Sequence, residues 1–353
     1  MHEARVLVVD DSAAMRALFS DLLDQTKNVV VVGTAASADE ARKQIVELKP
    51  NVLTLDVEMP GMSGIDFLKE IMEDKPMPVV MLSSLTQAGT DTSLKAYELG
   101  AVECFPKPLK ATPEQFAKTV GKLGKIVLAA ANSNVKDAST RKRAAEAKVA
   151  AAAEAQFDWN GHVVALSASM GGIDALGDLL ASWPAQCPPT IITLGLEPMV
   201  VDAFINRMSD QLPCTIKAAT DGAALTPGTI HIAADPSCHA LIEAGQPPKV
   251  RLVARDPVEG ARPSATLLFG TMARAGVPAV GAVLTGMGED GAKGLKLLRD
   301  AGAATFAQDP ASATVGEAPA AAIAAGAVQT PLPLEGLAAA ILGKCSTSGS
   351  FAG

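Results

Sequence analysis

Apolar runs of strand length recur in the first part of the chain, and each is followed by a polar side chain. The runs cover residues 5–9, 51–55, 78–82 and 101–106. Amphipathic stretches of helix length lie between them, at Ala13–Asp24, Ala38–Leu48 and Gly64–Glu73. Short apolar runs that alternate with such stretches indicate βα units, which build a parallel sheet. The pattern predicts an α/β fold with a doubly wound parallel sheet.

The polar residues that follow these runs are Asp10, Asp11, Asp56, Ser83 and Lys107. The carboxyl ends of parallel strands meet at one edge of the sheet, where ligands gather. Three carboxylates together need a hard cation, and an all-oxygen ligand set suits Mg²⁺. Asp56 would then be a carboxylate nucleophile toward a phosphoryl donor, with Lys107 on the phosphate oxygens and Ser83 donating a hydroxyl. The alternative, for any one acid alone, is a helix cap or a solvated loop position.

These residues lie in segments that carry a family resemblance. The segments Val8–Ser12, Leu55–Gly64, Met81–Ser84 and Phe105–Pro108 resemble the receiver domain of two-component response regulators. The resemblance implies a flavodoxin-like fold in which Asp56 accepts phosphate from a sensor histidine kinase. It also implies that Asp10 and Asp11 hold Mg²⁺ with the backbone carbonyl of Glu58, and that Ser83 is the switch hydroxyl.

A second pattern begins after residue 160. The apolar run Gly161–Leu166 leads into the loop 167–172, which contains Ser169 and two glycines, and a helical stretch follows at 173–182. A serine on a strand-to-helix turn exposes its hydroxyl and lets backbone N–H groups face an oxyanion. The alternative is a helix N-cap serine. A second strand, Ala279–Leu284, leads into a loop that places Asp290 at the same sheet edge.

The two loops resemble the catalytic domain of the chemotaxis receptor methylesterases, the CheB family. The matching segments are 168–172, 232–239, 262–264, 285–292 and 307–312. The resemblance implies a Rossmann-like second domain in which Ser169 attacks a glutamyl methyl ester of a chemoreceptor or deamidates a glutamine. Asp290 would orient a histidine, and the backbone at Met170 and Met287 would bind the oxyanion. A receiver ahead of this domain is the family's own architecture.

The histidine of this family pattern is missing from the chain. Anchoring on the helix residue Phe204 puts Gly195 where the imidazole is expected, after the strand 189–193. A serine of ordinary pKa is a poor nucleophile without a base. We therefore expect ester hydrolysis to be lost or strongly impaired; the alternative is a carboxylate base at Glu197. Two further departures are Cys104, where many receivers carry an aromatic switch, and Ala265–Thr266, where the family would have a Val-Asp pair.

Composition fits two α/β domains in one chain. Of 353 residues, 48% are hydrophobic, and the formal net charge of −8 argues against nucleic acid as a partner. Five cysteines without CxxC spacing indicate neither a disulfide framework nor a zinc site. No signal segment or membrane span is expected, so we place the protein in the cytoplasm. The expected divisions are a receiver at 1–128, a linker with a helical spacer at 129–158, a methylesterase-like domain at 159–344 and a polar tail at 345–353.

Several functions stay open at this point. The first is a phosphorylation-controlled regulator or adaptor whose esterase-like domain no longer hydrolyses esters. The second is an active methylesterase and glutamine deamidase that uses a non-standard base, and the third is a phosphate sink for a shared histidine kinase. A different class is a dinucleotide site, because Gly286–Gly291 fits GxGxxG and Asp309 follows near the distance of a ribose-binding acid.

Overall fold

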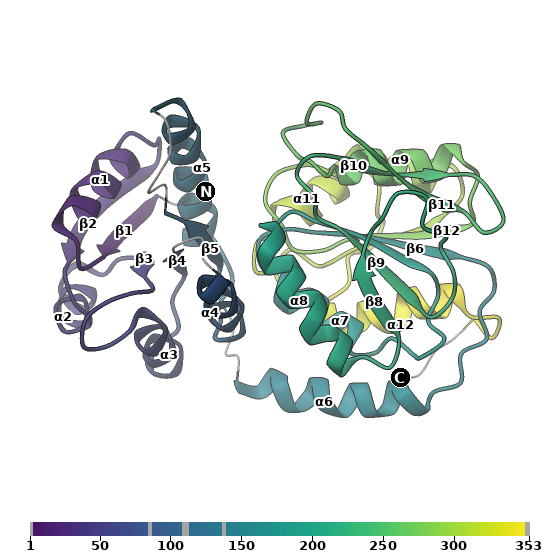
Figure 1. Cartoon of the computed structure of the whole chain (residues 1–353), viewed down its shortest axis with the longest axis horizontal. Helices are drawn as coiled ribbons and strands as arrows, with labels where there is room; N and C mark the ends of the chain where they lie inside the picture. The colour runs from purple at the N-terminus through teal and green to yellow at the C-terminus, as the bar shows by residue number, and fades with distance from the viewer. Residues whose placement is uncertain (1–2, 84–86, 108–112, 136–138, 350–353) are drawn as a thin grey trace. The chain divides into compact units, whose positions relative to one another are not determined.

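The computed structural model describes residues 3–83, 87–107, 113–135 and 139–349 of the chain (Figure 1). The chain divides into two compact units, Met1–Ser139 and Thr140–Gly353. This division lies within the stretch 129–158 that we expected to link two domains. Helix α6 (Ser139–Glu154) forms there, with few buried side chains among its described residues.

The first unit is built on a sheet of five parallel strands in the order β2-β1-β3-β4-β5. The strands are β1 (Ala4–Val9), β2 (Val29–Ala35), β3 (Val52–Asp56), β4 (Val79–Ser83) and β5 (Glu103–Pro106). This 2-1-3-4-5 order is that of flavodoxin-like folds. The predicted fold class is therefore confirmed, although strand β2, which carries no site residue, was not among the predicted runs.

Helices flank this sheet, and their starts follow from the sequence. They are α1 (Ala13–Asp24), α2 (Ala38–Leu48), α3 (Gly64–Asp74), α4 (Gln87–Glu98) and α5 (Pro113–Ala131). The first three begin after Ser12, Ser37 and Ser63, whose hydroxyls accept a hydrogen bond from the N–H three residues later. Such N-caps satisfy backbone donors that the first helical turn leaves unpaired. The predicted bounds of α1 and α2 agree with the structure, and α3 ends one residue later than predicted.

The second unit is built on six parallel strands in the order β13-β12-β6-β7-β9-β8. These strands are β6 (Val163–Ala168), β7 (Thr190–Leu194), β8 (Thr215–Ala218), β9 (Thr229–Ala233), β12 (Ala279–Val283) and β13 (Ala304–Ala307). From β6 the chain first adds strands on the β7 side and later adds β12 and β13 on the other side. The sheet order thus reverses between β6 and β12, and ligands bind at such a switch point.

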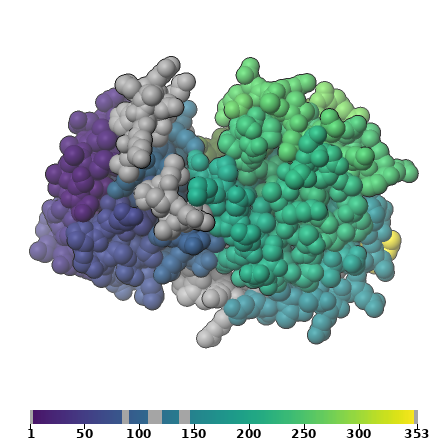
Figure 2. Space-filling model, viewed as in Figure 1, coloured from purple at the N-terminus to yellow at the C-terminus, as the bar shows by residue number. Residues whose placement is uncertain are grey.

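The remaining elements of this unit cover the sheet or stand apart from it. The helices are α7 (Gly172–Leu180), α8 (Pro198–Gln211), α9 (Ala265–Arg274), α10 (Ala292–Asp300), α11 (Glu317–Ala324) and α12 (Leu334–Cys345). Strands β10 (His239–Glu243) and β11 (Lys249–Val253) form a separate antiparallel pair. Alternate residues of β11 are exposed, and this part of the chain, in green, lies at the surface in Figure 2.

The end of the chain closes the second unit. The structure places Cys345, the first residue of the predicted polar tail, in α12 with a fully buried side chain. Ser346 then pairs with Trp159 in a β-bridge, and the N–H of Asn160 donates to the carbonyl of Cys345 at 2.9 Å. The segment that precedes β6 is thus hydrogen-bonded to the end of α12. Among the described residues, no helix combines the length and apolar character needed to cross a membrane.

Candidate functional sites

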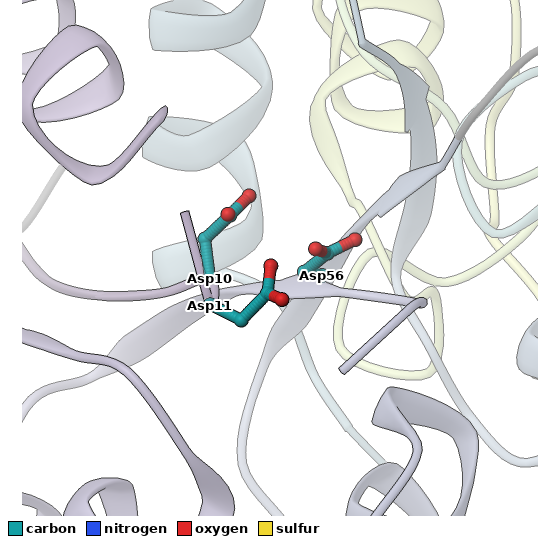
Figure 3. A group of neighbouring side chains, drawn as sticks. All are labelled: Asp10, Asp11 and Asp56. Carbon is teal, nitrogen blue, oxygen red and sulfur yellow. The ribbon is translucent and has the colours of Figure 1, made fainter. Parts of the chain in front are cut away.

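The predicted acidic site forms at the carboxyl ends of β1 and β3, where Figure 3 shows Asp10, Asp11 and Asp56 in one group. Asp10 and Asp56 are buried, with 0% and 3% of their surfaces exposed, while Asp11 is exposed. The ammonium group of Lys107 lies 2.9 Å from Asp10 Oδ2 and 2.7 Å from Asp56 Oδ1. A single cation therefore bridges two buried carboxylates that would otherwise repel each other.

The acidic group also fits a divalent cation. One carboxylate oxygen from each of the three aspartates lies within 4.8 Å of the others, and oxygen ligands are those that Mg²⁺ prefers. Asp10, Asp11 and Asp56 would hold the ion, which would neutralise charge on a transferring phosphoryl group. Glu58 lies beside them, and its N–H donates to Asp56 Oδ1 at 3.1 Å. The role of the Glu58 carbonyl as a metal ligand stays a prediction.

The electrostatics of this site follow from burial. Burial raises the pKa of Asp56, and the neighbouring Asp10 acts in the same direction, while Lys107 and the N–H of Glu58 oppose the shift. Burial lowers the pKa of Lys107, but its two carboxylate partners together raise it above the ordinary value. Lys107 therefore stays charged at neutral pH and favours the ionised, nucleophilic form of Asp56.

Ser83 ends strand β4, next to the strand that carries Asp56. Asp56 pairs with Leu82 across the two strands, so Ser83 lies one residue beyond the level of Asp56. Its side chain is buried, and its carbonyl accepts a hydrogen bond from the N–H of Lys107 at 2.8 Å. Its role as the switch hydroxyl stays a prediction.

Two features of the first unit were missed by sequence reasoning. The guanidinium of Arg16 donates to the carbonyls of Asp10 and Asp11, at 2.8 and 3.0 Å, and so fixes the acidic turn. A basic residue in the first turns of the helix after two aspartates was the available signal. The second feature is Tyr97, whose buried hydroxyl bonds to the Glu103 carboxylate and accepts from the N–H of Cys104 at 3.1 Å.

The serine turn of the second unit forms at the end of β6, beside β12. Gly171 has a φ of 76°, which L side chains rarely adopt, and a Cβ there would lie 2.6 Å from Thr314 Cβ. The N–H of Ser169 donates to the carbonyl of Thr285 at 3.1 Å, and the N–H of Met287 donates to Ser169 Oγ at 3.1 Å. The predicted nucleophile and one predicted oxyanion donor are therefore together. Met170, the other, is buried, and its carbonyl accepts from the Thr285 hydroxyl at 2.9 Å.

Gly195 follows β7 and faces the serine. A Cβ built on Gly195 would lie 3.3 Å from Ser169 Cβ, so a side chain at this position would be in contact with Ser169. Instead, a cavity of about 70 Å³ opens beside Ser169 and Gly195. Asp290 is the one ionisable side chain among its lining residues, all of which belong to the described part of the chain.

Asp290 lines this cavity but is already bonded to the start of helix α9. Its Oδ1 accepts from the Ser264 hydroxyl at 2.7 Å and from the N–H of Thr266 at 3.1 Å. Its Oδ2 accepts from the N–H of Ala265 at 2.7 Å. The carboxylate therefore satisfies two backbone donors of the first helical turn and sits at the positive end of the helix dipole. Sequence reasoning missed this, because no local signal links residues 264–266 to residue 290.

None of the second unit's histidines replaces the missing base, within the described residues. His162 precedes β6, at the far end from Ser169, and its ring lies 2.7 Å from Asn160 Oδ1. His231 is buried within β9, paired with Ile191, and away from the strand end. His239 is fully buried, with Nδ1 accepting from the N–H of Ser264 and Nε2 next to the carbonyl of Asp256. Both nitrogens of His239 are thus in use.

Glu197 and the glycine-rich loop 286–291 also lack the geometry that base catalysis and dinucleotide binding, respectively, would need. Glu197 takes the N-cap position of α8 and is not among the residues that line the cavity.

In the glycine-rich loop, the N–H groups of Gly286, Gly288 and Gly291 donate to Val315, Glu317 and Thr266. A dinucleotide phosphate would need those donors, so the structure does not favour the dinucleotide site.

Comparisons with known proteins cover nearly the whole chain. Residues 164–341 match the family model of the CheB methylesterase, and residues 6–120 match that of the response regulator receiver domain. A protein-glutamate methylesterase/protein-glutamine glutaminase 1 of Caulobacter vibrioides is 43% identical over 349 residues, covering 98% of this chain and 99% of that protein. A protein-glutamate methylesterase/protein-glutamine glutaminase of Agrobacterium fabrum is also 43% identical, over 344 residues and 96% of each chain.

Among solved structures, the chain is similar to the CheB methylesterase catalytic domain of Thermotoga maritima. The identity is 24% and the TM-score 0.49, over 52% of this chain and 98% of that chain. The family itself is established by the sequence matches. One family model covers half of the chain, the receiver model covers the part before it, and the relatives match both units without interruption. This chain belongs to the CheB family, in which a response regulator receiver domain precedes a methylesterase domain.

Proposed function

We propose that this chain is a chemotaxis-type response regulator of the cytoplasm, phosphorylated on Asp56 by a sensor histidine kinase. Its methylesterase-like domain would bind a chemoreceptor or another signalling protein. On its own, this domain would not hydrolyse esters efficiently. The family membership supports the regulatory part, and the geometry at Ser169 supports the loss of hydrolysis.

One observation carries the second part of the proposal. The hydroxyl of Ser169 takes part in one hydrogen bond among the described residues, and it is the acceptor in that bond. Its own proton therefore has no base to receive it, since the cavity beside it is lined by Gly195 where the family pattern implies histidine. Removing the base of a serine hydrolase triad lowers kcat by about 10⁶-fold in subtilisin. A loss of that order leaves only the catalysis that the oxyanion site and substrate binding supply without a base, about 10³–10⁴-fold over water in subtilisin.

The receiver retains what aspartyl phosphorylation requires. The ionised carboxylate of Asp56 attacks the phosphorus of the donor, and the leaving group departs from the opposite side. The Lys107 ammonium, 2.7 Å from Asp56 Oδ1, is placed to contact the phosphoryl oxygens as negative charge accumulates there. Phosphorylation would then change which conformations of the receiver are populated, and this change would be transmitted to the second domain.

The test combines phosphorylation and hydrolysis in one preparation. Purified full-length protein receives Mg²⁺ and a small phosphodonor, and methanol release from methylated receptor membranes is followed beside Ser169→Ala. We expect phosphorylation that Asp56→Asn abolishes, with methanol release equal to that of Ser169→Ala. Release that depends on Ser169 would refute the loss of hydrolysis.

A second candidate is an active methylesterase and deamidase, because the relatives at 43% identity are named for these activities. It predicts Ser169-dependent release in the same assay, and Glu197→Gln would test the carboxylate base. The phosphate sink is a third candidate, supported by the Asp56 site alone. It predicts that a strain lacking residues 157–353 keeps the wild-type phenotype.

A further inference from the structure

We infer that the cavity beside Ser169 binds an imidazole supplied from outside the chain, and that this imidazole acts as the general base for ester hydrolysis. Its source is either a histidine side chain of the partner protein or a free imidazole compound. This inference rests on the proposed function, in which the chain alone lacks a base.

The cavity has the size of the group. Its volume is about 70 Å³, and one water occupies about 10–15 Å³ on the same measure. The space therefore accommodates about five to seven waters, which leaves room for a five-membered imidazole ring. Gly195 keeps this space open, because even a methyl group there would lie 3.3 Å from Ser169 Cβ. The cavity thus lies directly against the nucleophile.

The walls of the cavity present two different polar partners. Ser169 Oγ has a proton to donate and lacks an acceptor among the described residues. Asp290 can accept a further donor, because its Oδ2 carries one hydrogen bond and each carboxylate oxygen has about two acceptor positions. A group that fills the cavity must therefore accept from Ser169 and donate to Asp290.

Neutral imidazole meets both requirements with its two ring nitrogens, one an acceptor and the other a donor. An ammonium group has no acceptor, and a second carboxylate would be repelled by Asp290. An unperturbed imidazole also titrates near neutrality, so it can take a proton and return it at physiological pH. The chain's own His239 cannot fill this role, since both of its nitrogens are bonded elsewhere.

The reaction then balances without another reagent. The imidazole nitrogen removes the Ser169 proton as Oγ bonds to the ester carbon, and the N–H of Met287 donates to the carbonyl oxygen. The imidazolium returns the proton to the departing methoxide, which leaves as methanol, while the acyl group stays on Ser169. The same imidazole next deprotonates a water that attacks the acyl carbon. Ser169 regains a proton, and a glutamate side chain is released.

The test uses full-length protein and a glutamyl methyl ester peptide in two arms. In the first arm, free imidazole is titrated at fixed pH, and in the second a histidine replaces a glutamine near the ester of the peptide. We expect saturable methanol release, at least tenfold above protein and imidazole measured separately, in one arm or both. The arm that responds identifies the source of the base.

Control variants tie the effect to the cavity. Ser169→Ala should abolish the increase, and Gly195→Val should remove it by filling the space. Gly195→His should restore release without added imidazole. N-methylimidazole, which has similar basicity but no N–H for Asp290, should give a smaller increase than imidazole. Calorimetric titration of imidazole against wild type and Gly195→Val gives a readout that does not depend on turnover.

Two outcomes would overturn the inference. One is an unchanged rate in both arms with no binding heat that Gly195→Val removes. The other is an increase that is equal in Ser169→Ala, which would mean catalysis by imidazole in solution. Native tryptophan fluorescence of Gly195→Val verifies that the variant is folded, and Gly195→Ala replaces it if it is not. Ser169-dependent release without imidazole would refute the proposed function instead, so the two failures are distinguishable.

Discussion

Replacing Asp290 by alanine should destabilise the second unit, whatever happens to hydrolysis. The carboxylate accepts three hydrogen bonds, two of them from the backbone at the start of α9 and one from Ser264. At a net value of about 1 kcal/mol for each bond, the loss is about 3 kcal/mol in the free energy of unfolding. Asp290→Asn retains one acceptor oxygen and should lose about half as much.

Tryptophan fluorescence is suited to this measurement, because both tryptophans of the chain, Trp159 and Trp183, lie in the second unit. Trp183 is fully buried, so its emission should change on unfolding. In urea, with a slope of about 2 kcal/mol per molar, a loss of about 3 kcal/mol lowers the midpoint by about 1.5 M.

A matched control for this change is Glu289→Ala, next to Asp290 in the same loop and exposed. Its effect should stay within about 0.5 kcal/mol. If the midpoint of Asp290→Ala moves no further than that of Glu289→Ala, the carboxylate does not anchor α9 and our reasoning is wrong. If the large shift is found, the failure of Asp290→Ala to hydrolyse esters with added imidazole is not by itself proof of a catalytic role.

Three further predictions concern charge and pH. Without metal, Lys107→Met leaves Asp10 and Asp56 buried without their cation, a change that costs about 3–5 kcal/mol, and Mg²⁺ should raise its Tm more than that of wild type. In the presence of a chelator at pH 7, Asp56→Asn should be more stable than wild type. Burial raises the pKa of Asp56, so the folded state is stabilised at low pH, where Asp56 is protonated, and this stabilisation is lost as the pH rises. Thermal scans from pH 4 to 8 should show that the difference in Tm between Asp56→Asn and wild type becomes smaller toward pH 4. Burial lowers the pKa of His231, and the charge of Lys217 acts in the same direction. The unfolded state therefore binds a proton that the folded state does not, so the free energy of unfolding of the wild type should decrease as the pH is lowered through about 6.5. In urea titrations, His231→Leu should remove this pH dependence.

The acidic site could be predicted from the sequence because its geometry follows from strand ends. Asp10 directly follows β1, and Asp56 is the last residue of β3, which pairs with β1 in parallel. Lys107 directly follows β5. Their convergence needs only the rule that parallel strands end at one edge. The same rule brought Ser169 and the loop of Asp290 together, since β6 and β12 are neighbours.

What the sequence could not supply are contacts between elements that no period or motif connects. Asp290 bonds to a helix that starts 25 residues earlier, and His239 bonds to the residue before that helix. The place of β9 between β7 and β8, and the separate pair β10–β11, depend on how the whole unit packs. Local patterns indicated the strands that carry the site residues, while the sheet order depends on long-range packing.

The serine site keeps its geometry without a histidine because other parts of the fold hold it. The backbone of Ser169 is bonded to Thr285, and Gly286 packs so closely that an added Cβ would lie 2.5 Å from Ser169 Oγ. Asp290 is held by α9 rather than by an imidazole. If the chain lacks a base, as proposed, only the proton acceptor is missing, and Ser169, the N–H of Met287 and Asp290 are still in place. This is why a single imidazole, bound in the cavity or restored by Gly195→His, should be sufficient to recover hydrolysis.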